Sequence, residues 1–170
     1  WRQVMHGFAT NLTPEDNQAI AAQLYVEMLK AGYTAVGEFH YLPLDPNGEP
    51  YADRAEMSHG ITNAAAEAGI VLTHLPVLYS VGGYGGVEPN DGQRRYILEV
   101  EDFLNLVGGL ISTNKDDPQV RIGIAPHSVR QVPTAPLAAA LDGFTDLVPD
   151  GPIHIHAAEQ IKDVEEHITY

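Results

Sequence analysis

The sequence predicts an α/β fold that is part of a (β/α)8 or TIM barrel, with about four consecutive βα units in one domain. Three observations predict it. Short apolar runs alternate with helical patterns, which implies right-handed crossovers and a parallel sheet. These runs are apolar almost throughout, as expected for strands that are covered on both faces. Polar side chains also follow directly after each run.

The polar side chains at the ends of the runs favour a barrel over an open sheet. In chain order they are His40 and Tyr41, Tyr79 and Ser80, His127 and Ser128, and His156 and Glu159. Active sites of (β/α)8 barrels lie at the carboxyl ends of several strands, whereas an open doubly wound sheet works chiefly at its switch point. A whole barrel has about 250 residues. Four of the eight βα units, here in 170 residues, amount to roughly half of one.

The clearest helix follows Thr13. Thr13 is a favoured N-cap residue, Pro14 fits the first helical position, and Glu15 and Asp16 lie near the positive end of the helix dipole. Gly32 ends the pattern. We expect a helix between these limits.

The remaining elements follow in alternation. We expect strands at residues 34–41, 70–80, 119–128 and 152–159, and helices at residues 54–69, 93–112, 134–144 and from 161 onward. Turn-rich loops at 45–53 and 81–92 separate them. The "GGYGG" run in the second loop lacks the Lys and Ser/Thr of a phosphate-binding loop and is better explained as a mobile lid.

Composition excludes several classes of function. A formal net charge of −14, from 23 acidic and 9 basic residues, would repel nucleic acid and anionic membranes. The chain has no apolar run near the ~20 residues that span a bilayer. It has no cysteine, so any metal must be held by His, Asp or Glu, and this composition suits the cytoplasm. We expect an enzyme that acts on a small molecule.

The run at 152–159 carries the strongest chemical signal. His154 and His156 are two apart, so in a strand they face the same side, about 6.6 Å apart. Glu159 can join them only if the chain turns out of the strand. Imidazole is a common zinc ligand, and a nearby carboxylate can move protons at a metal-bound water. The alternative is a pair of hydrogen-bonded core histidines, because a catalytic zinc typically needs three protein ligands.

Other polar residues leave two interpretations open. His40 and His127 either line a site or satisfy loop carbonyls. Arg130 is either a surface cation or, just past a strand end, an anchor that grips a substrate carboxylate in bidentate fashion. Arg94 and Arg95 would open the expected helix at 93–112, where positive charge is unfavourable, so another role is expected for them.

Several runs resemble the amidohydrolase superfamily and, within it, the formimidoylglutamate deiminases, iminohydrolases of a histidine-degradation route. They are "AAQLYVEMLKAGYTAVGEFHYL", "GQRRYILEVEDFL", "GIAPHSVRQV" and "HIHAAEQIKDVEE", with "EFHYL" and "APHSVR" the most specific. The resemblance implies a barrel with one zinc ion, held by an HxH pair on the first strand, a His on the fifth and an Asp on the eighth. It makes His156 the fifth-strand ligand and Glu159 the proton-shuttling residue, and gives His154 no ligand role. Tyr41, His127 and Arg130 would hold the substrate, with Arg130 facing a glutamate carboxylate.

The other ligands of that family have no counterpart in this chain. The HxH pair is expected before Trp1, and a sixth-strand His and the eighth-strand Asp after Tyr170. We therefore expect residues 1–170 to be a fragment of one catalytic barrel domain, inactive alone and with unpaired sheet edges. The full-length enzyme, expected to be a homo-oligomer, would convert formimidoyl-L-glutamate and water to N-formyl-L-glutamate and ammonia. The alternatives are an aminohydrolase acting on a cyclic base of nucleobase or triazine type, or a non-catalytic barrel module.

Overall fold

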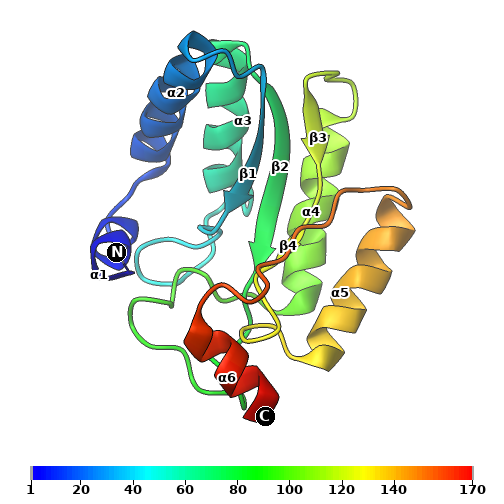
Figure 1. Ribbon diagram of the computed structural model, residues 1–170. Coiled ribbons are helices and arrows are strands. Elements are labelled where there is room, and N and C mark those ends of the chain that lie inside the picture. Colours follow the sequence, from blue (N-terminus) through cyan, green and yellow to red (C-terminus); the bar gives the residue numbers. More distant parts are fainter. Residues whose placement is uncertain (1, 170) are drawn as a thin grey trace.

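The strands form one parallel sheet. The computed structural model describes residues 2–169. Strand β1 (Ala35–His40) pairs with β2 (Val71–Leu78), and β2 pairs with both β3 (Val120–Ile122) and β4 (Ala125–Pro126). All of these pairings are parallel. The predicted parallel sheet is confirmed, and its carboxyl ends meet at one edge (Figure 1).

Helices connect the strands and cover them. The helices are α1 (Arg2–Ala9), α2 (Pro14–Lys30), α3 (Glu56–Ala68), α4 (Val100–Asn114), α5 (Thr134–Leu147) and α6 (Ile161–Thr169). Figure 1 shows α2 and α3 beside β1 and β2, α4 and α5 beside β3 and β4, and α6 below the carboxyl ends of the strands. None of the described helices is long and apolar enough to cross a membrane.

The predicted start of α2 is confirmed in atomic detail. The hydroxyl of Thr13 accepts a hydrogen bond from the backbone N–H of Asp16, and the carboxylate of Asp16 accepts one from the backbone N–H of Thr13. This reciprocal capping box satisfies two N–H groups that the helix itself cannot. The sequence analysis did not identify α1, which has no acidic residue in its first turn.

Three apolar clusters hold the layers together. One lies between α4, α5 and the sheet and contains Phe103, Phe144 and Ile124. A second joins α2 and α3 to the first two strands. The third lies at the carboxyl ends of the strands and contains Tyr79 and Tyr96. The polar side chains at the strand ends pack against this third cluster.

The expected helix at 93–112 begins seven residues late, at Val100. Residues 93–96 form turns and residues 97–99 are irregular, because Arg95 is buried there with 1% of its surface exposed. Its guanidinium donates to the backbone oxygens of Ala9, Leu12 and Leu44. This is the other role expected for Arg95, since the side chain ties three loops together. Arg94 is exposed and donates to the carbonyl of Pro46.

The expected strand at 119–128 is divided at Gly123 into β3 and β4. A Cβ at Gly123 would lie 2.4 Å from the carbonyl oxygen of Pro152, so glycine lets the segment after α5 approach the sheet closely.

The expected strand at 152–159 is reduced to two isolated parallel bridges, which join Ile153 to Ile124 and His156 to Ser128. The segment still runs along the sheet, because the amides of His154 and His156 donate to the carbonyls of Ile124 and His127. Ala158 ends it, with a φ of 51° in the left-handed region that turns the chain away.

Candidate active site

Three side chains from different strand ends meet in one cluster. Tyr41 follows β1, His127 follows β4, and His156 lies on the segment beside β4. The hydroxyl of Tyr41 is 2.9 Å from Nε2 of His156. The ring centroid of His127 lies 5.0 Å from that of His156 and 5.5 Å from that of Tyr41. The structure thus brings together three of the predicted site residues.

His156 is held on the inner face of the sheet by Phe39. The two rings stack with centroids 4.3 Å apart. Phe39 alternates along β1 with Glu38 and His40, which face the helices, so the stack places His156 on the side away from them. The ring of His156 therefore lies on the face of the sheet opposite to the helices.

The hydroxyl of Tyr41 keeps its proton at neutral pH. Burial raises the pKa of Tyr41 above its ordinary value, and the carboxylate of Glu159 and the neighbouring Tyr79 and Tyr96 raise it further. A neutral hydroxyl can donate to a nitrogen or an oxygen. Tyr41 can therefore donate to His156 or to a molecule that takes its place.

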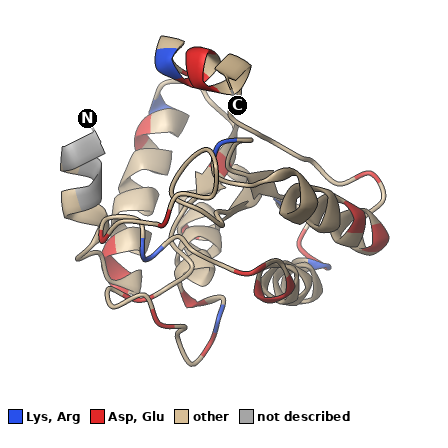
Figure 2. Ribbon diagram, turned by 90° about the horizontal axis from the view of Figure 1, so that it is seen from below, with Lys and Arg blue, Asp and Glu red and all other residues tan. Residues whose placement is uncertain are grey.

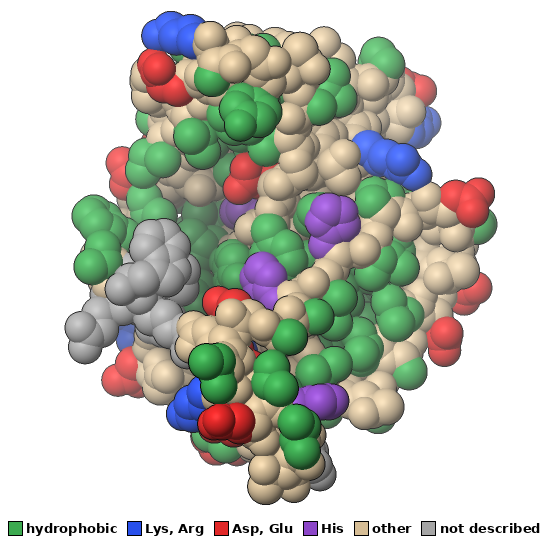
Figure 3. Space-filling model, viewed as in Figure 1, with side chains coloured by type: hydrophobic (Ala, Val, Ile, Leu, Met, Phe, Trp, Pro, Cys, Tyr) green, Lys and Arg blue, Asp and Glu red, His purple; other side chains and the backbone are tan. Residues whose placement is uncertain are grey.

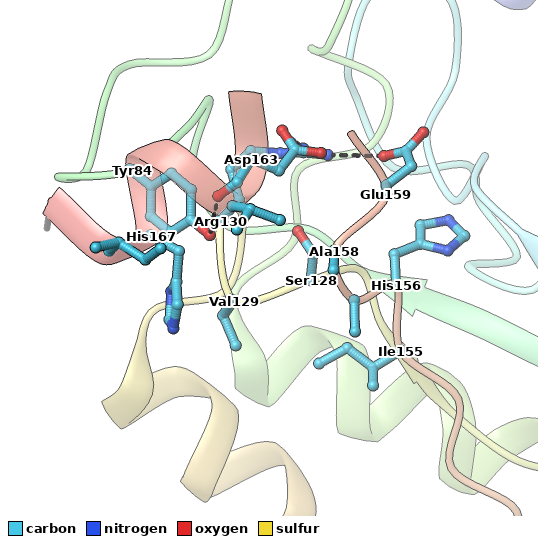
Figure 4. Close-up of a pocket in the computed structure, with 13 residues that line it drawn as sticks. Tyr84, Ser128, Val129, Arg130, Ile155, His156, Ala158, Glu159, Asp163 and His167 are labelled. Carbon is cyan, nitrogen blue, oxygen red and sulfur yellow. Dashed lines mark hydrogen bonds and ion pairs between the residues drawn. The ribbon is translucent and has the colours of Figure 1, made fainter. Parts of the chain in front are cut away.

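Glu159 and Arg130 form an ion pair beside this cluster. The turn at Ala158 brings Glu159 back over the site, and its Oε2 lies 3.3 Å from a terminal nitrogen of Arg130 (Figure 4). The other terminal nitrogen of Arg130 pairs with the carboxylate of Asp163 in α6. Burial lowers the pKa of Arg130, but Asp163 and Glu159 outweigh it, so that the pKa lies above its ordinary value. The predicted carboxylate anchor is thus already occupied by two carboxylates of the chain.

Glu159 remains in contact with water. Its side chain is 46% exposed, whereas that of Arg130 is 11% exposed. A carboxylate that touches both a buried cation and solvent can exchange protons with water. This arrangement suits the proton-moving role that the sequence assigns to Glu159.

A polar cavity of about 370 Å³ joins these groups. Tyr41, His127, Arg130 and Glu159 line it, together with residues that the sequence analysis left unassigned: Asn90, Gln93, Tyr96, Gln131, Lys162 and Asp163. Gln93 donates to the hydroxyl of Tyr79 over 2.6 Å. All of the unassigned residues except Asn90 lie in runs that carry the family resemblance, which is the signal that could have found them.

A second, apolar cavity of about 450 Å³ lies on the other side of the segment 155–159. Val129, Ile155, Val164 and Ile168 line it, and Tyr84 of the "GGYGG" loop lies against His167 of α6 (Figure 4). Figure 3 shows hydrophobic side chains and histidines gathered around a hollow on one face of the molecule. Glu159 lines both cavities, whereas His156 lines the apolar one.

Two candidate histidines lie apart from the site. His40 is buried on the helix-facing side of β1, where its ring centroid is 5.2 Å from that of His74. Burial lowers the pKa of His40 to about 4. His154 is exposed and lies near Gly37 on the inner face, two residues from His156. His40 is therefore a packing residue, and the proposed site does not require His154.

The described residues supply part of a metal site. No group of three His, Asp or Glu side chains among residues 2–169 is placed to hold a metal ion. His156 offers one imidazole nitrogen, Nε2, and that nitrogen contacts only the neutral hydroxyl of Tyr41 in the described contacts. One ligand fits a zinc ion that draws its other ligands from elsewhere, because zinc sites need three or four.

Acidic residues are spread over helices and loops around the molecule, and basic ones are few (Figure 2). Arg130 is one of nine basic residues in the chain, and it lies in the site. A cation in an acidic protein is a selective place for an anionic group.

No family model matches the chain. The formimidoylglutamate deiminase of Pseudomonas aeruginosa is 46% identical over 98% of this chain, which corresponds to 36% of that protein. The crystal structure of an amidohydrolase from Brucella melitensis is 48% identical with a TM-score of 0.92, covering 100% of this chain and 37% of that one. A variant of an atrazine chlorohydrolase from Arthrobacter aurescens, in complex with zinc and atraton, is 20% identical with a TM-score of 0.72, covering 92% and 33%. The last likeness concerns the fold alone.

These likenesses bear on the predicted fold and family. The chain spans little more than a third of the length of the relatives it matches. Its parallel α/β architecture has the fold of the corresponding part of an amidohydrolase barrel, so the predicted fold class is confirmed. Over all of its length, the chain is similar to the amidohydrolases, as its sequence indicates.

Proposed function

We propose that the chain forms the substrate-holding part of a metal-dependent hydrolase that converts formimidoyl-L-glutamate and water to N-formyl-L-glutamate and ammonia. The observation that carries the proposal is the joint presence of Tyr41, Arg130 and Glu159 around one polar cavity, with Nε2 of His156 2.9 Å from the hydroxyl of Tyr41, in a chain 46% identical to a formimidoylglutamate deiminase. The complete activity belongs to the whole protein, of which we propose that these residues are one part.

His156 would be one protein ligand of a divalent ion, which the family resemblance makes zinc. When bound, such an ion lowers the pKa of a water molecule to about 7, so that hydroxide is available at neutral pH. The remaining ligands would come from outside these 170 residues. Solved relatives with bound zinc support the expectation of a metal for the fold.

Arg130 and Tyr41 would hold the substrate. The guanidinium of Arg130 is planar and can grip a carboxylate through two parallel hydrogen bonds. A substrate carboxylate would compete with Glu159 for the terminal nitrogen that now pairs with it. Tyr41, whose hydroxyl stays neutral, would donate to a substrate oxygen or orient the ring of His156.

Glu159 would move the protons. Water adds to the formimino carbon, the C=N double bond becomes single, and Glu159 delivers a proton to the nitrogen. A second proton transfer lets that nitrogen leave as ammonia while the C=O bond of the product forms. Substrate that displaces Glu159 from Arg130 would release the carboxylate for this work.

The direct test is a substrate assay of the whole protein with the Glu159→Gln variant beside it. The amide keeps the size of the side chain but cannot carry protons, so we expect turnover to fall by at least ~10² while bound zinc stays the same. Exposed Glu49→Gln is the matched control and should keep full activity. Unchanged turnover in Glu159→Gln would remove Glu159 from the mechanism, and turnover of cyclic bases but not of formimidoyl-L-glutamate would overturn the proposed substrate.

A further inference from the structure

Gln131 lies buried and is linked to two of the predicted substrate-binding residues, Arg130 and His127. It is 4% exposed and follows Arg130 directly. Its side-chain Oε1 accepts a hydrogen bond from Nε of Arg130 over 2.9 Å and a second from the hydroxyl of Ser128 over 2.5 Å. The hydroxyl of Ser128 in turn lies 3.1 Å from Nδ1 of His127. One amide oxygen thus links Arg130 to His127 through Ser128.

The chemistry of Arg130 fixes the direction of each hydrogen bond in this series of linked side chains. A guanidinium has donors and no acceptor, so the atom of Gln131 that faces it must be the amide oxygen and not the amide nitrogen. An oxygen can only accept, so Ser128 uses its single hydroxyl hydrogen toward Gln131. Ser128 is then an acceptor toward His127, and Nδ1 of His127 must carry a hydrogen. In the neutral ring the other nitrogen, Nε2, is therefore an acceptor.

The backbone holds Gln131 rigidly in this position. Its carbonyl accepts hydrogen bonds from the amides of Ser80 and Val81, which follow β2, and its own amide donates to the carbonyl of Ser128. Gln131 therefore connects the ends of two neighbouring strands. A side chain that is fixed on both its backbone and its amide can orient its neighbours to the precision that a binding site requires.

We propose that Gln131 is a positioning residue that fixes both the direction of the Arg130 guanidinium and the tautomer of His127. Since Nε of Arg130 is engaged by Gln131, the two terminal nitrogens are the ones left for carboxylates. His127, with its hydrogen on Nδ1, has Nε2 as its acceptor nitrogen in the neutral ring. This inference rests on the proposed function for its kinetic part alone.

Three variants of the whole protein separate the two effects. Gln131→Met removes the acceptor at similar length, Gln131→Glu keeps two acceptor oxygens, and Ser128→Ala breaks the link to His127 while leaving Gln131 beside Arg130. The matched control is Gln23→Met, because Gln23 is exposed and bonds only Glu27 of its own helix in the described contacts. The measurements are KM and kcat for formimidoyl-L-glutamate and the 15N chemical shifts of the His127 ring.

We expect Gln131→Met to raise KM about tenfold or more with a smaller change in kcat, because a buried hydrogen bond to a charged group is lost. Gln131→Glu should restore most of the affinity. The 15N shifts should report a hydrogen on Nδ1 in the parent protein and in Gln131→Glu. In Gln131→Met and Ser128→Ala they should move toward a mixture of tautomers, with KM changed little in Ser128→Ala.

The results that overturn the inference are distinct from failure of the proposed function. A parent protein with its hydrogen on Nε2 of His127, or Ser128→Ala with unchanged shifts, removes the tautomer role. An unchanged KM in Gln131→Met removes the role toward Arg130. If the whole protein does not hydrolyse formimidoyl-L-glutamate, the proposed function fails, while the shifts still decide the hydrogen-bond chain. If Gln131→Met does not fold, Gln131→Leu replaces it for the role toward Arg130, while Ser128→Ala tests the tautomer role.

Discussion

Arg130 concentrates the charge of the site in one side chain. It is nearly buried, pairs with Asp163 and Glu159, and is oriented by Gln131. Two carboxylates against one guanidinium leave an excess of negative charge that a substrate carboxylate would meet on arrival. Binding would therefore require Glu159 to move toward solvent, where it is already 46% exposed.

Replacement of Arg130 by Ala should weaken binding more than it slows chemistry. The variant loses charge-assisted hydrogen bonds, so we expect KM for formimidoyl-L-glutamate to rise at least tenfold with a smaller change in kcat. Arg121→Ala is the control, because Arg121 is exposed and donates to the carbonyl of Asp150 far from the cavity. An unchanged KM in Arg130→Ala would mean that another group holds the carboxylate.

The segment at 152–159 shows how an element carries a site without being a regular strand. Few of its backbone groups pair with the sheet, yet those that do belong to His154 and His156 and to their neighbours. The close approach at Gly123 sets the distance of this segment from β4, and Ala158 sets the point at which it turns. The position of His156 therefore depends on one glycine in the neighbouring strand.

Gly123→Ala should move this segment and destabilise the protein. The added methyl would meet the carbonyl oxygen of Pro152 at 2.4 Å and Cδ2 of Leu75 at 2.8 Å, so the backbone must shift. Overpacking of this kind costs about 1–3 kcal/mol in unfolding free energy, which urea unfolding measures.

Gly109→Ala provides the control with the opposite sign. Gly109 lies within α4, and a Cβ there would meet nothing within 4 Å. Alanine in an exposed helix position stabilises by roughly 0.5–1 kcal/mol relative to glycine. Equal effects of the two substitutions would show that the contact with Pro152 does not set the position of the segment.

Across the whole molecule, the sequence predicted what local pattern and strand polarity determine. Parallel pairing and the meeting of Tyr41, His127 and His156 follow from strands that all end at one edge. The late start of α4 could not be predicted from local pattern, because the side chain of Arg95 donates hydrogen bonds to carbonyls 51 or more residues away in the sequence. The pairing of Arg130 with Asp163 depends on the turn at Ala158, which propensity does not indicate for alanine.

The stability of the whole molecule should fall in mild acid because of the buried pair His40 and His74. Burial lowers the pKa of His40 to about 4 and that of His74 well below its ordinary value. Below pH 6.5 these two histidines bind protons in the unfolded chain, whereas in the folded protein they stay neutral until the pH is lower. The stabilisation is therefore complete above pH 6.5 and is lost as the pH falls toward 4, by on the order of 3 kcal/mol for His40.

Urea unfolding between pH 4 and 7 measures this loss. His40→Met should show a smaller decline than the parent protein, while the exposed His154→Gln should decline as the parent does. Glu38, whose pKa is raised by burial, acts in the opposite sense and is present in all three proteins, so it cancels in the comparison. An identical decline in His40→Met and the parent would exclude His40 as a cause.

The two faces of strand β1 have different roles, one in packing and one at the candidate site. Glu38 and His40 point to the helices, where Tyr25 and His74 meet them, while Phe39 and the following Tyr41 point to the cavity. Alternate residues of this short segment are thus under different structural constraints. Substitutions of Glu38 or His40 should alter the resistance of the protein to heat and acid, and substitutions of Phe39 or Tyr41 should alter which molecule the cavity accepts. Evolution or an engineer can therefore adjust durability and selectivity independently within residues 35–41.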